Sequence, residues 1–500
     1  MSAESADAKA VFSGVRWTGA SQMVTEGVRM LVSVVLARLL TPEDFGLLSM
    51  AGVVTGFFMV LQYLGAPGVV VQRKNLTNSL ISSLFILNLM FSAVLFVALL
   101  LVASWLASIY NEPRLTPIIQ ALGISFFLTA FAAVPVAIFN RRMQFDKIAW
   151  MSFAAAITQG VVAIILAALD FKVWALVYSN IISSLVTVIA IWWMLDWRPK
   201  WVFVWREVRE VMGFCLHLTG SGLIDYFSRD SDKFIIGKWL GEKLLGYYAM
   251  AGRFCLYPPT TISPILNRVL FPAFARVQED QAQLQKIMLR SVEAISFITM
   301  PIIAGIMVVS DPFVMAVLGP KWAPAIQIMI LLSPVGYFLS VHGPANQMIT
   351  ALGKASWLFW LTTISGILTV AAFFAGLHWG IIGVVVAYFI ITVPLTLMRY
   401  LLAFRLVKLP LYRLVPALYR YAIGAVIMAA SVYGLRKLLE MVGLHPLAVI
   451  CIAIPIGMVV YAVLMLVWRP AAVYDFYQVL PTRAKLATGR ILSRVHISLD

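Results

Sequence analysis

Apolar residues dominate this chain in long stretches that short polar segments separate. Stretches such as "SLFILNLMFSAVLFVALLLVASWLA" and "PLAVICIAIPIGMVVYAVLMLVW" exceed the ~20 residues that a helix needs to cross a bilayer. Each should be helical, because lipid offers no partner to free backbone groups. A window of about 19 residues predicts about fourteen spans, near 14–37, 45–66, 79–106, 117–140, 148–169, 174–195, 213–237, 245–268, 287–310, 323–350, 355–376, 379–400, 419–438 and 446–468. The pattern predicts an all-α, multi-pass membrane protein whose neighbouring helices are antiparallel.

The charged residues set the expected orientation. Only 12% of the 500 residues are charged, yet the net charge is +16 and the mean hydropathy is +0.92. With the N-terminus in the cytoplasm, about 25 Lys and Arg residues lie on that side and about 8 on the other, which the positive-inside rule reads as N-in and C-in. Because these residues lie in short loops and no basic face of a nucleic-acid module occurs, no nucleic-acid partner is expected. The three cysteines fit no zinc or disulfide pattern.

One segment recurs two hundred residues later. Residues 34–52, "VVLARLLTPEDFGLLSMAG", align without a gap with 234–252, "FIIGKWLGEKLLGYYAMAG", and residues 113–120 match 320–327 at an offset of 207. Six spans separate the equivalents, so both copies face the same way, as in parallel repeats. We expect two six-helix bundles around a central cavity. The predicted parts are an N-lobe at 1–200, a C-lobe at 201–405, two further helices at 406–470 and a cytoplasmic tail at 471–500.

Polar side chains gather inside the predicted spans on one helix of each copy. The first carries Gln22, Glu26, Arg29 and Ser33, and the second carries Ser221, Asp225, Arg229 and Asp232, with Asp230 and Lys233 beside them. The first set follows spacings of four, three and four residues and the second of four, four and three, so each lies on one helix face. Arg253 lies in the next predicted span. Intramembrane ionisable residues usually face a wet cavity or a partner. Two interpretations stay open, namely cavity lining and structural ion pairs that hold helices together.

The cationic residues favour an anionic substrate. Guanidinium groups pair well with phosphate oxygens. Arg29, Arg229 and Arg253, with Gln22 and Lys233, are therefore candidates for binding a phosphate-bearing head group. The acids Glu26, Asp225 and Asp232 would hold the arginines in place or bind a coupling ion, H⁺ or Na⁺. We expect no other cofactor, no metal site and no catalytic residue, since the chain lacks the motifs HExxH, GxGxxG, the Walker loop and the nucleophile elbow.

The acids at the start of the repeated segment are better explained as helix punctuation. Thr41 suits an N-cap, Pro42 the first helical position, and Glu43 and Asp44 the positive end of a helix. The second copy reads Gly241, Glu242 and Lys243 at the places of Thr41, Pro42 and Glu43, so no carboxylate pair is shared. The linker "DWRPKWVFVWREVREVMGF" is expected to lie at the lipid head groups as an interfacial helix or loop.

The segments "LARLLTPEDFGLLSMA" and "NRVLFPAFARVQED", with the duplicated layout, resemble the polysaccharide transporter family. These are bacterial flippases of lipid-linked oligosaccharides within the multidrug/oligosaccharidyl-lipid/polysaccharide exporter superfamily. The likeness is greatest to the branch that serves colanic acid or succinoglycan. It implies an undecaprenyl-diphosphate-linked repeat unit as substrate, alternating access without ATP hydrolysis, a place in the inner membrane, and a role in exopolysaccharide or O-antigen biosynthesis beside a polymerase and glycosyltransferases. Basic cavity residues of the family match Arg29, Arg229 and Arg253.

Two alternatives remain at this point. A multidrug or cation antiporter of the same superfamily would usually have twelve spans and a more acidic cavity. A membrane polysaccharide polymerase or glycosyltransferase would carry a sizeable outside loop with catalytic acids, and no such loop is predicted.

Overall fold

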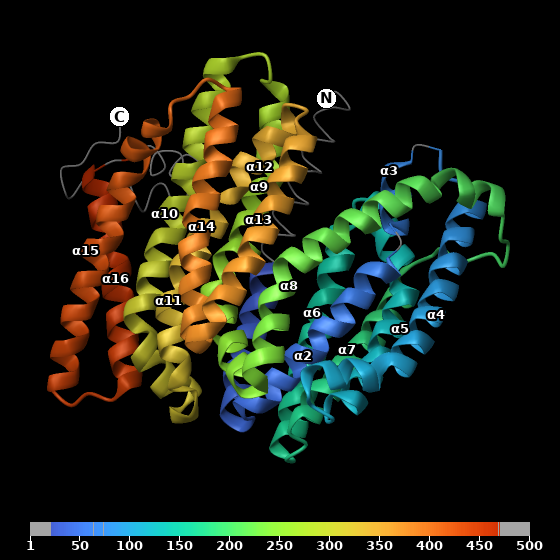
Figure 1. The fold of residues 1–500 in the computed structure, drawn as a ribbon, viewed down its shortest axis with the longest axis horizontal. Helices are drawn as coiled ribbons and strands as arrows, with labels where there is room; N and C mark the ends of the chain where they lie inside the picture. Colours follow the sequence, from blue (N-terminus) through green and yellow to red (C-terminus); the bar gives the residue numbers. More distant parts are fainter. Residues whose placement is uncertain (1–21, 64, 74, 469, 471–500) are drawn as a thin grey trace. The chain divides into compact units, whose positions relative to one another are not determined.

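A computed structural model describes residues 22–63, 65–73, 75–468 and 470. Every regular element within these ranges is a helix (Figure 1). The chain divides into two compact units, Met1–Met250 and Ala251–Asp500. The predicted lobe boundary at 200/201 lies inside the first unit, and the predicted tail at 471–500 lies outside the described residues.

The first unit is an assembly of long apolar helices. After a helix at 22–39 come α2 (Pro42–Gln62), α3 (Ala66–Gln72), α4 (Asn78–Tyr110), α5 (Leu115–Arg141), α6 (Phe145–Ala168), α7 (Val173–Met194) and most of α8 (Trp205–Cys255). α4 packs along α5, and α7 packs against both α5 and α6. The 33 residues of α4 make a helix about 50 Å long, which is more than the hydrocarbon core of a bilayer requires.

α8 consists of two helical arms that meet at one residue. Gly241 has φ 85° and ψ 173°, a backbone conformation that glycine adopts most readily. The Tyr248 hydroxyl of the second arm donates to Asp232 Oδ2 of the first arm at 2.6 Å. In a straight helix these residues would be about 24 Å apart, so the chain reverses at Gly241. The predicted segments 213–237 and 245–268 therefore meet without a loop between them.

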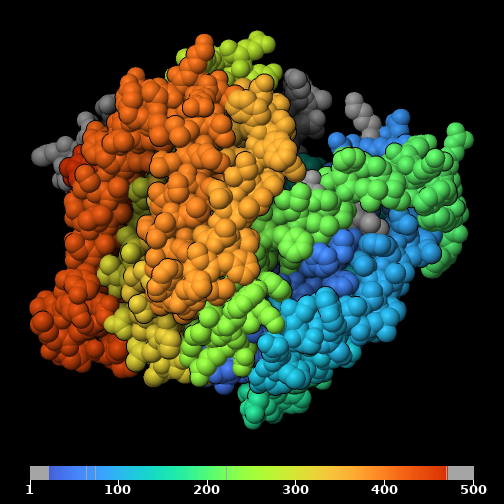
Figure 2. All heavy atoms as spheres, viewed as in Figure 1, coloured from blue at the N-terminus to red at the C-terminus, as the bar shows by residue number. Residues whose placement is uncertain are grey.

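The second unit contains the remaining helices and several irregular turns. They are the π-helical turn η1 (Pro258–Ile262), α9 (Ser263–Arg276), α10 (Gln281–Phe313), the π-helical turn η2 (Val314–Leu318), the 3-10 turn η3 (Pro320–Trp322), α11 (Pro324–Ser340), α12 (His342–Ala351), α13 (Ala355–Gly376), the 3-10 turn η4 (Leu377–Trp379), α14 (Gly380–Leu406), the 3-10 turn η5 (Leu411–Arg413), α15 (Leu414–Met441) and α16 (Pro446–Trp468). α13 and α14 lie side by side and present one continuous face (Figure 2).

Two of these helices separate at a proline. Pro344 has no N–H to donate to the carbonyl of Ser340, and α11 ends there. The Ser263 hydroxyl donates to that carbonyl at 3.1 Å, while the Tyr400 hydroxyl donates to the carbonyl of Val341 at 2.7 Å. The predicted span 323–350 is thus two helices, and hydroxyl groups satisfy the freed carbonyls between them.

Ten helical segments of the described chain are long and apolar enough to cross a membrane. α8 is not among them, because its ionisable residues lower its hydropathy, and α13 and α14 form one segment of 52 residues. Residues 1–21 are not described. The fourteen spans and the N-in, C-in orientation therefore stay predictions. Large apolar side chains such as Leu101, Trp193 and Met441 are exposed on the helices, as contact with lipid requires. The protein is a multi-pass membrane protein.

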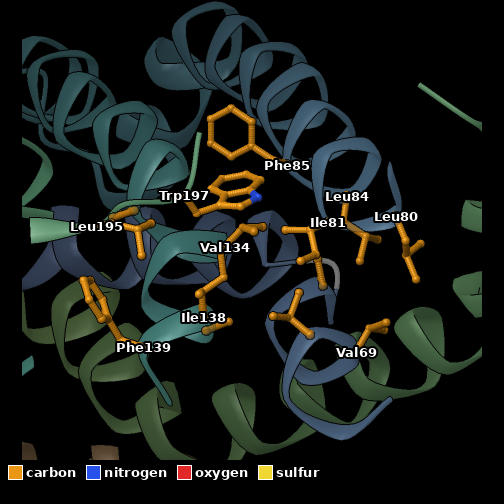
Figure 3. Packing of buried hydrophobic residues seen from close by; sticks show 14 of the residues in the cluster. Val69, Leu80, Ile81, Leu84, Phe85, Val134, Ile138, Phe139, Leu195 and Trp197 are labelled. Atoms are coloured by element: carbon orange, nitrogen blue, oxygen red, sulfur yellow. The ribbon is translucent and has the colours of Figure 1, made fainter. Parts of the chain in front are cut away.

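Buried apolar clusters hold each unit together. In the first, residues of α3, α4 and α5 enclose Leu195 and Trp197 from the linker before α8 (Figure 3). Trp197 is buried there, with its ring centroid 6.0 Å from that of Phe85, whereas Trp201 is exposed. The place of this linker at the lipid head groups stays a prediction. In the second unit α15 and α16 pack on α10, where the Tyr461 hydroxyl donates to the carbonyl of Phe297 at 3.1 Å.

Candidate functional site

The two predicted polar faces carry ion pairs that stay within their own helices. Arg29 Nη1 lies 2.7 Å from Glu26 Oε1, three residues earlier. Arg229 Nε lies 3.8 Å from Asp225 Oδ2, four residues earlier. The arginine side chains remain 42% and 71% exposed. These pairs join no two helices, so the interpretation that they hold helices together does not apply to them, and donor groups of both arginines are left for another ligand.

The other predicted residues differ in their surroundings. Gln22 is half-buried, and Lys233 forms an ion pair with Asp230 at 2.6 Å. Asp232 is buried, where it accepts hydrogen bonds from the hydroxyl of Tyr248 at 2.6 Å and from the backbone N–H of Lys233 at 2.7 Å. It therefore links the arms of α8. The residue spacing along one helix could not predict this link between the arms, because Tyr248 contacts Asp232 only when the chain reverses at Gly241.

Arg253 belongs to the second unit, where its side chain is exposed in the last turn of α8. A hollow of about 620 Å³ lies in the first unit at the beginnings of α2, α5 and α7. Asp44, Arg114, Asp170 and Lys172 provide its charged lining. None of the predicted binding residues of this unit lines that hollow. Their assignment to a central cavity remains a prediction.

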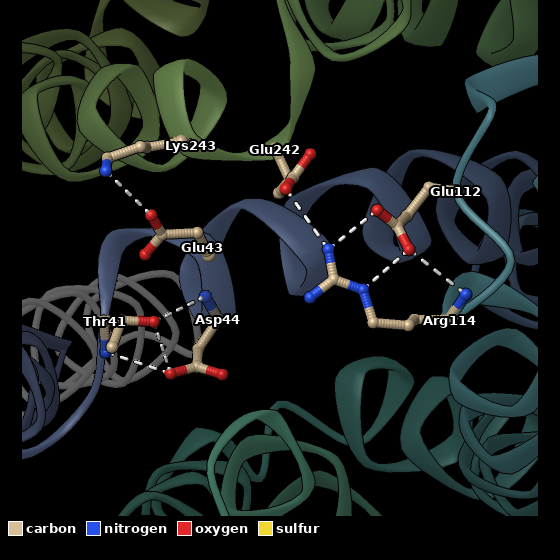
Figure 4. A network of polar contacts seen from close by, with 7 residues as sticks. All are labelled: Thr41, Glu43, Asp44, Glu112, Arg114, Glu242 and Lys243. Atoms are coloured by element: carbon tan, nitrogen blue, oxygen red, sulfur yellow. Dashed lines mark hydrogen bonds and ion pairs between the residues drawn. The ribbon is translucent and has the colours of Figure 1, made fainter.

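A second polar cluster surrounds the beginning of α2 (Figure 4). Thr41 is the N-cap, as predicted. Its backbone N–H and its hydroxyl both donate to Asp44 Oδ2, at 2.9 and 2.8 Å, and its hydroxyl oxygen accepts from the Asp44 N–H. The two residues satisfy each other's end groups as a capping box. The carboxylate of Asp44 is thus committed to helix punctuation.

The neighbouring charges of this cluster connect α2 and α5 to the turn in α8. Glu43 Oε1 lies 3.1 Å from Lys243 Nζ, and these two residues occupy equivalent places in the predicted repeat. Arg114 lies 2.7 Å from Glu112 and 3.2 Å from Glu242. The hydrogen bond from Arg114 lowers the pKa of Glu112, and the same contact raises the pKa of Arg114. Arg114 therefore stays charged and bridges two carboxylates.

Two glycines allow these segments to approach closely. A Cβ on Gly46 would lie 1.7 Å from the carbonyl oxygen of Glu242, and a Cβ on Gly246 would lie 1.9 Å from that of Pro42. Both distances are far below contact, so only glycine fits this crossing. The contact is reciprocal, because residues 42 and 242, like residues 46 and 246, are equivalents at the offset of 200. We call this crossing, with Glu43, Lys243, Arg114 and Glu242, the glycine junction.

The sequence alone predicts no role for Arg114, Glu242 or Lys243. A signal was available for Lys243, since the alignment at an offset of 200 pairs it with an acid of opposite charge. Arg114 gave no such signal, because its contact with Glu242 spans 128 residues. Among the residues that the structure describes, no group of three or more His, Cys, Asp or Glu side chains is arranged to hold a metal ion.

Comparison with known proteins places the chain in a family. The profile described as "Polysaccharide biosynthesis protein" matches residues 35–327, which is more than half of the chain. The chain belongs to this family. It is 26% identical to the lipopolysaccharide biosynthesis protein WzxC of Escherichia coli over 83% of this chain and 88% of WzxC. It is also 26% identical to the succinoglycan biosynthesis transport protein ExoT of Rhizobium meliloti over 92% of this chain and 93% of ExoT.

Solved structures share the fold at low sequence identity. The lipid II flippase MurJ, in an inward closed conformation, matches with a TM-score of 0.74 and 15% identity over 90% of this chain and 98% of MurJ. An inward-facing multidrug resistance MATE family transporter of the MOP superfamily matches with a TM-score of 0.63 and 15% identity over 77% of this chain and 96% of that one. The chain therefore shares its fold with these two transporters.

Proposed function

We propose that the protein is a flippase that moves undecaprenyl-diphosphate-linked oligosaccharide repeat units across the bacterial inner membrane for exopolysaccharide or O-antigen biosynthesis. The observation that carries the proposal is the match to a succinoglycan biosynthesis transport protein over nearly the full length of both chains. The fold that the chain shares with a lipid II flippase supports a lipid-linked substrate. The protein lies in the membrane as a multi-pass protein, with fourteen spans in two parallel repeats and both termini in the cytoplasm. A polymerase and glycosyltransferases of the same pathway would be its partners.

The exposed arginines would bind the diphosphate. Arg29 and Arg229 each keep donor groups that their own carboxylate does not occupy, and guanidinium forks match phosphate oxygens. Gln22, Lys233 and Arg253 would complete a polar lining. Glu26 and Asp225 orient the two arginines within their helices. The transport step needs no bond to form or break in the substrate, so no catalytic residue is assigned.

The glycine junction would close one side of the pathway. Its backbones are in contact and its charged residues pair between helices, so a bulky substrate cannot pass there while it holds. With the predicted orientation this is the outer side, and alternating access requires the junction to separate at that stage of the cycle. The coupling ion would be H⁺ or Na⁺, bound at an acid of the polar faces such as Asp225.

Translocation by purified protein in vesicles tests the proposal. A fluorescent undecaprenyl-diphosphate oligosaccharide in the inner leaflet should become accessible to an added sugar-binding protein at a rate that depends on the flippase. The single variants Arg29→Ala, Arg229→Ala and Arg253→Ala should slow it, while Arg405→Ala, an exposed arginine elsewhere, should not. Equal rates in vesicles with and without the protein would refute the function, and unchanged rates in all three variants would refute the assigned residues.

The coupling proposal has its own test. Asp225→Asn should change how the translocation rate responds to a collapsed proton or sodium gradient. Asn retains the size of the side chain and removes the charge. A response identical to that of the wild type would remove Asp225 from the coupling role and would leave the substrate assignment untouched.

A further inference from the structure

Arg399 is a buried cation in the second unit whose charge no described acid neutralises. It lies on α14, seven residues before the end of that helix, and only 7% of it is exposed. Its Nη1 donates to Oδ1 of Asn346 on α12 at 2.9 Å, and its buried Nε has no hydrogen-bond partner. No carboxylate of the described residues forms an ion pair with it. An amide oxygen is thus its one side-chain partner there.

Another arginine of the same unit shows what such burial usually requires. Arg436 on α15 is 8% exposed. Its Nε donates to Glu440 at 2.6 Å, its Nη2 pairs with Asp311, and its Nη1 donates to the carbonyl of Val308 at 3.0 Å. Two carboxylates therefore accompany a guanidinium that is buried to the same degree. Arg399 lacks that negative charge, and a buried charge without a partner is strongly disfavoured.

The residues around Arg399 supply hydrogen-bonding groups without negative charge. His342 Nε2 lies 2.7 Å from the Thr396 hydroxyl, which in turn donates to the carbonyl of Thr392. Tyr400, the next residue after Arg399, is buried and bonded to the carbonyl of Val341. These contacts fix α12 against α14 beside the guanidinium. They leave its charge and its Nε for a ligand that carries the missing anionic oxygens.

The position of Arg399 indicates where that ligand comes from. It lies about 10 Å along the helix from the end of α14, and Arg405, Lys408 and Arg413 follow within fourteen residues. Such a basic cluster at a helix end attracts the anionic head groups of the adjoining leaflet. Phosphate is therefore the anion present in quantity at this end of the unit, and it offers the oxygen geometry that a guanidinium binds best.

We propose that Arg399 and Asn346 form a phosphate-binding site at the end of α14, separate from the arginines assigned to the substrate above. A lipid phosphodiester and a polyprenyl diphosphate carry the same group, and the second source rests on the proposed function. The phosphate would approach from the end of α14 to the Nη2 and Nε side of the guanidinium, while Asn346 holds Nη1. Because α12 and α14 both contribute, a bound phosphate would tie these two helices together.

Ligand-dependent thermal stability of the full chain in detergent tests this site. The delipidated protein is titrated separately with inorganic phosphate, short-chain phosphatidylglycerol and farnesyl diphosphate, with short-chain diacylglycerol as the probe without phosphate. The wild type should be stabilised by at least one phosphate-bearing probe and not by diacylglycerol. The probe that binds most tightly identifies the source, a lipid phosphodiester or a polyprenyl diphosphate. No stabilisation by any phosphate-bearing probe, or equal stabilisation by diacylglycerol, overturns the proposal.

Two variants and one control locate the binding. Arg399→Gln should weaken binding by about tenfold or more, the effect of losing a hydrogen bond to a charged group. The control Arg142→Gln, at an exposed arginine of the first unit, should bind as the wild type does. Asn346→Asp puts a carboxylate beside Arg399, so it should raise the melting temperature of the ligand-free protein and abolish the response to phosphate. Wild-type affinity in both Arg399→Gln and Asn346→Asp would overturn the site. If the protein translocates substrate in vesicles but binds no phosphate at Arg399, the phosphate site is refuted and the proposed function is not.

Discussion

The glycine junction and the polar faces use the same kinds of charged residue in opposite ways. At the junction Glu43, Arg114 and Lys243 reach across to residues distant in sequence, and glycines let the backbones touch. On the faces of the helix at 22–39 and of α8, each arginine pairs with an acid one turn away and remains exposed. Charges that join helices stabilise one conformation, whereas charges that pair within a helix stay available to a ligand. The comparison predicts that the two regions respond differently to substitution.

The largest effect is expected on transport, from the polar faces. Arg29→Ala or Arg229→Ala should reduce translocation by about tenfold or more, since each would remove the proposed charge-assisted bonds to the substrate phosphate. Stability should change by less than about 0.5 kcal/mol, the worth of an exposed pair within a helix. Translocation in vesicles and thermal unfolding of the same preparations measure both effects. A large loss of stability with normal transport would reverse the assignment of these residues.

The next effect is expected on stability, from the junction. Gly46→Ala places a methyl group against the backbone of Glu242 and should cost about 1–3 kcal/mol, as overpacking does. Gly52→Ala is the matched control in the same helix, since nothing lies within 4 Å of its added Cβ. It should be neutral or slightly stabilising, because alanine favours a helix over glycine. Equal unfolding curves for both variants would show that the crossing is looser than described.

A charge exchange tests the pair that occupies equivalent places of the repeat. Glu43→Lys and Lys243→Glu each put like charges together and should lower the melting temperature by less than Gly46→Ala does, because both side chains are partly exposed. The double variant restores opposite charges and should recover the wild-type value at low salt. High salt should shrink all these differences. Additive losses in the double variant would show that the two residues do not interact.

The smallest effect is expected from pH. Because Arg114 lowers the pKa of Glu112 below its ordinary value of 4.5, the contact stabilises the junction fully above that value. Its contribution is lost as the pH falls through the lowered pKa. Melting temperatures should therefore decline more steeply below about pH 4.5 in the wild type than in Glu112→Gln. If the melting temperatures of the two proteins fell in parallel with pH, the contact between Glu112 and Arg114 would not contribute to stability.

Much of the fold was predictable from local patterns. Hydropathy predicts helices close to their observed bounds, as at 355–376 and 446–468, because a long apolar stretch in lipid must be helical. Thr41 was recognised as an N-cap because capping depends on a few adjacent residues. The reversal at Gly241 lies in the gap predicted between 213–237 and 245–268. The chain reverses there without a loop because of the backbone conformation of Gly241, which a hydropathy pattern cannot predict.

The candidate site was less accessible to sequence analysis. Periodicity put Asp232 on one face with Asp225 and Arg229, yet Asp232 is buried against Tyr248, a contact that requires the turn. The partners of Arg114 and the isolation of Arg399 depend on which helices pack together. Such contacts between distant segments are set by tertiary packing, so neither the spacing nor the composition of one segment can predict them.

The reciprocal contact at the glycine junction also suggests a history. In a two-fold homodimer, residue i of one subunit meets residue j of the other and j meets i, which is the relation of Pro42 to Gly246 and of Glu242 to Gly46. Under the predicted duplication, an unduplicated ancestor would have met a second copy of itself here, with the residue at position 43 near the axis facing its own twin. Identical residues there could have carried like charges or no charge, but not opposite charges. On this view, fusion into one chain would have freed the two positions to diverge. Glu43 and Lys243 form an opposite pair that no symmetric dimer could contain.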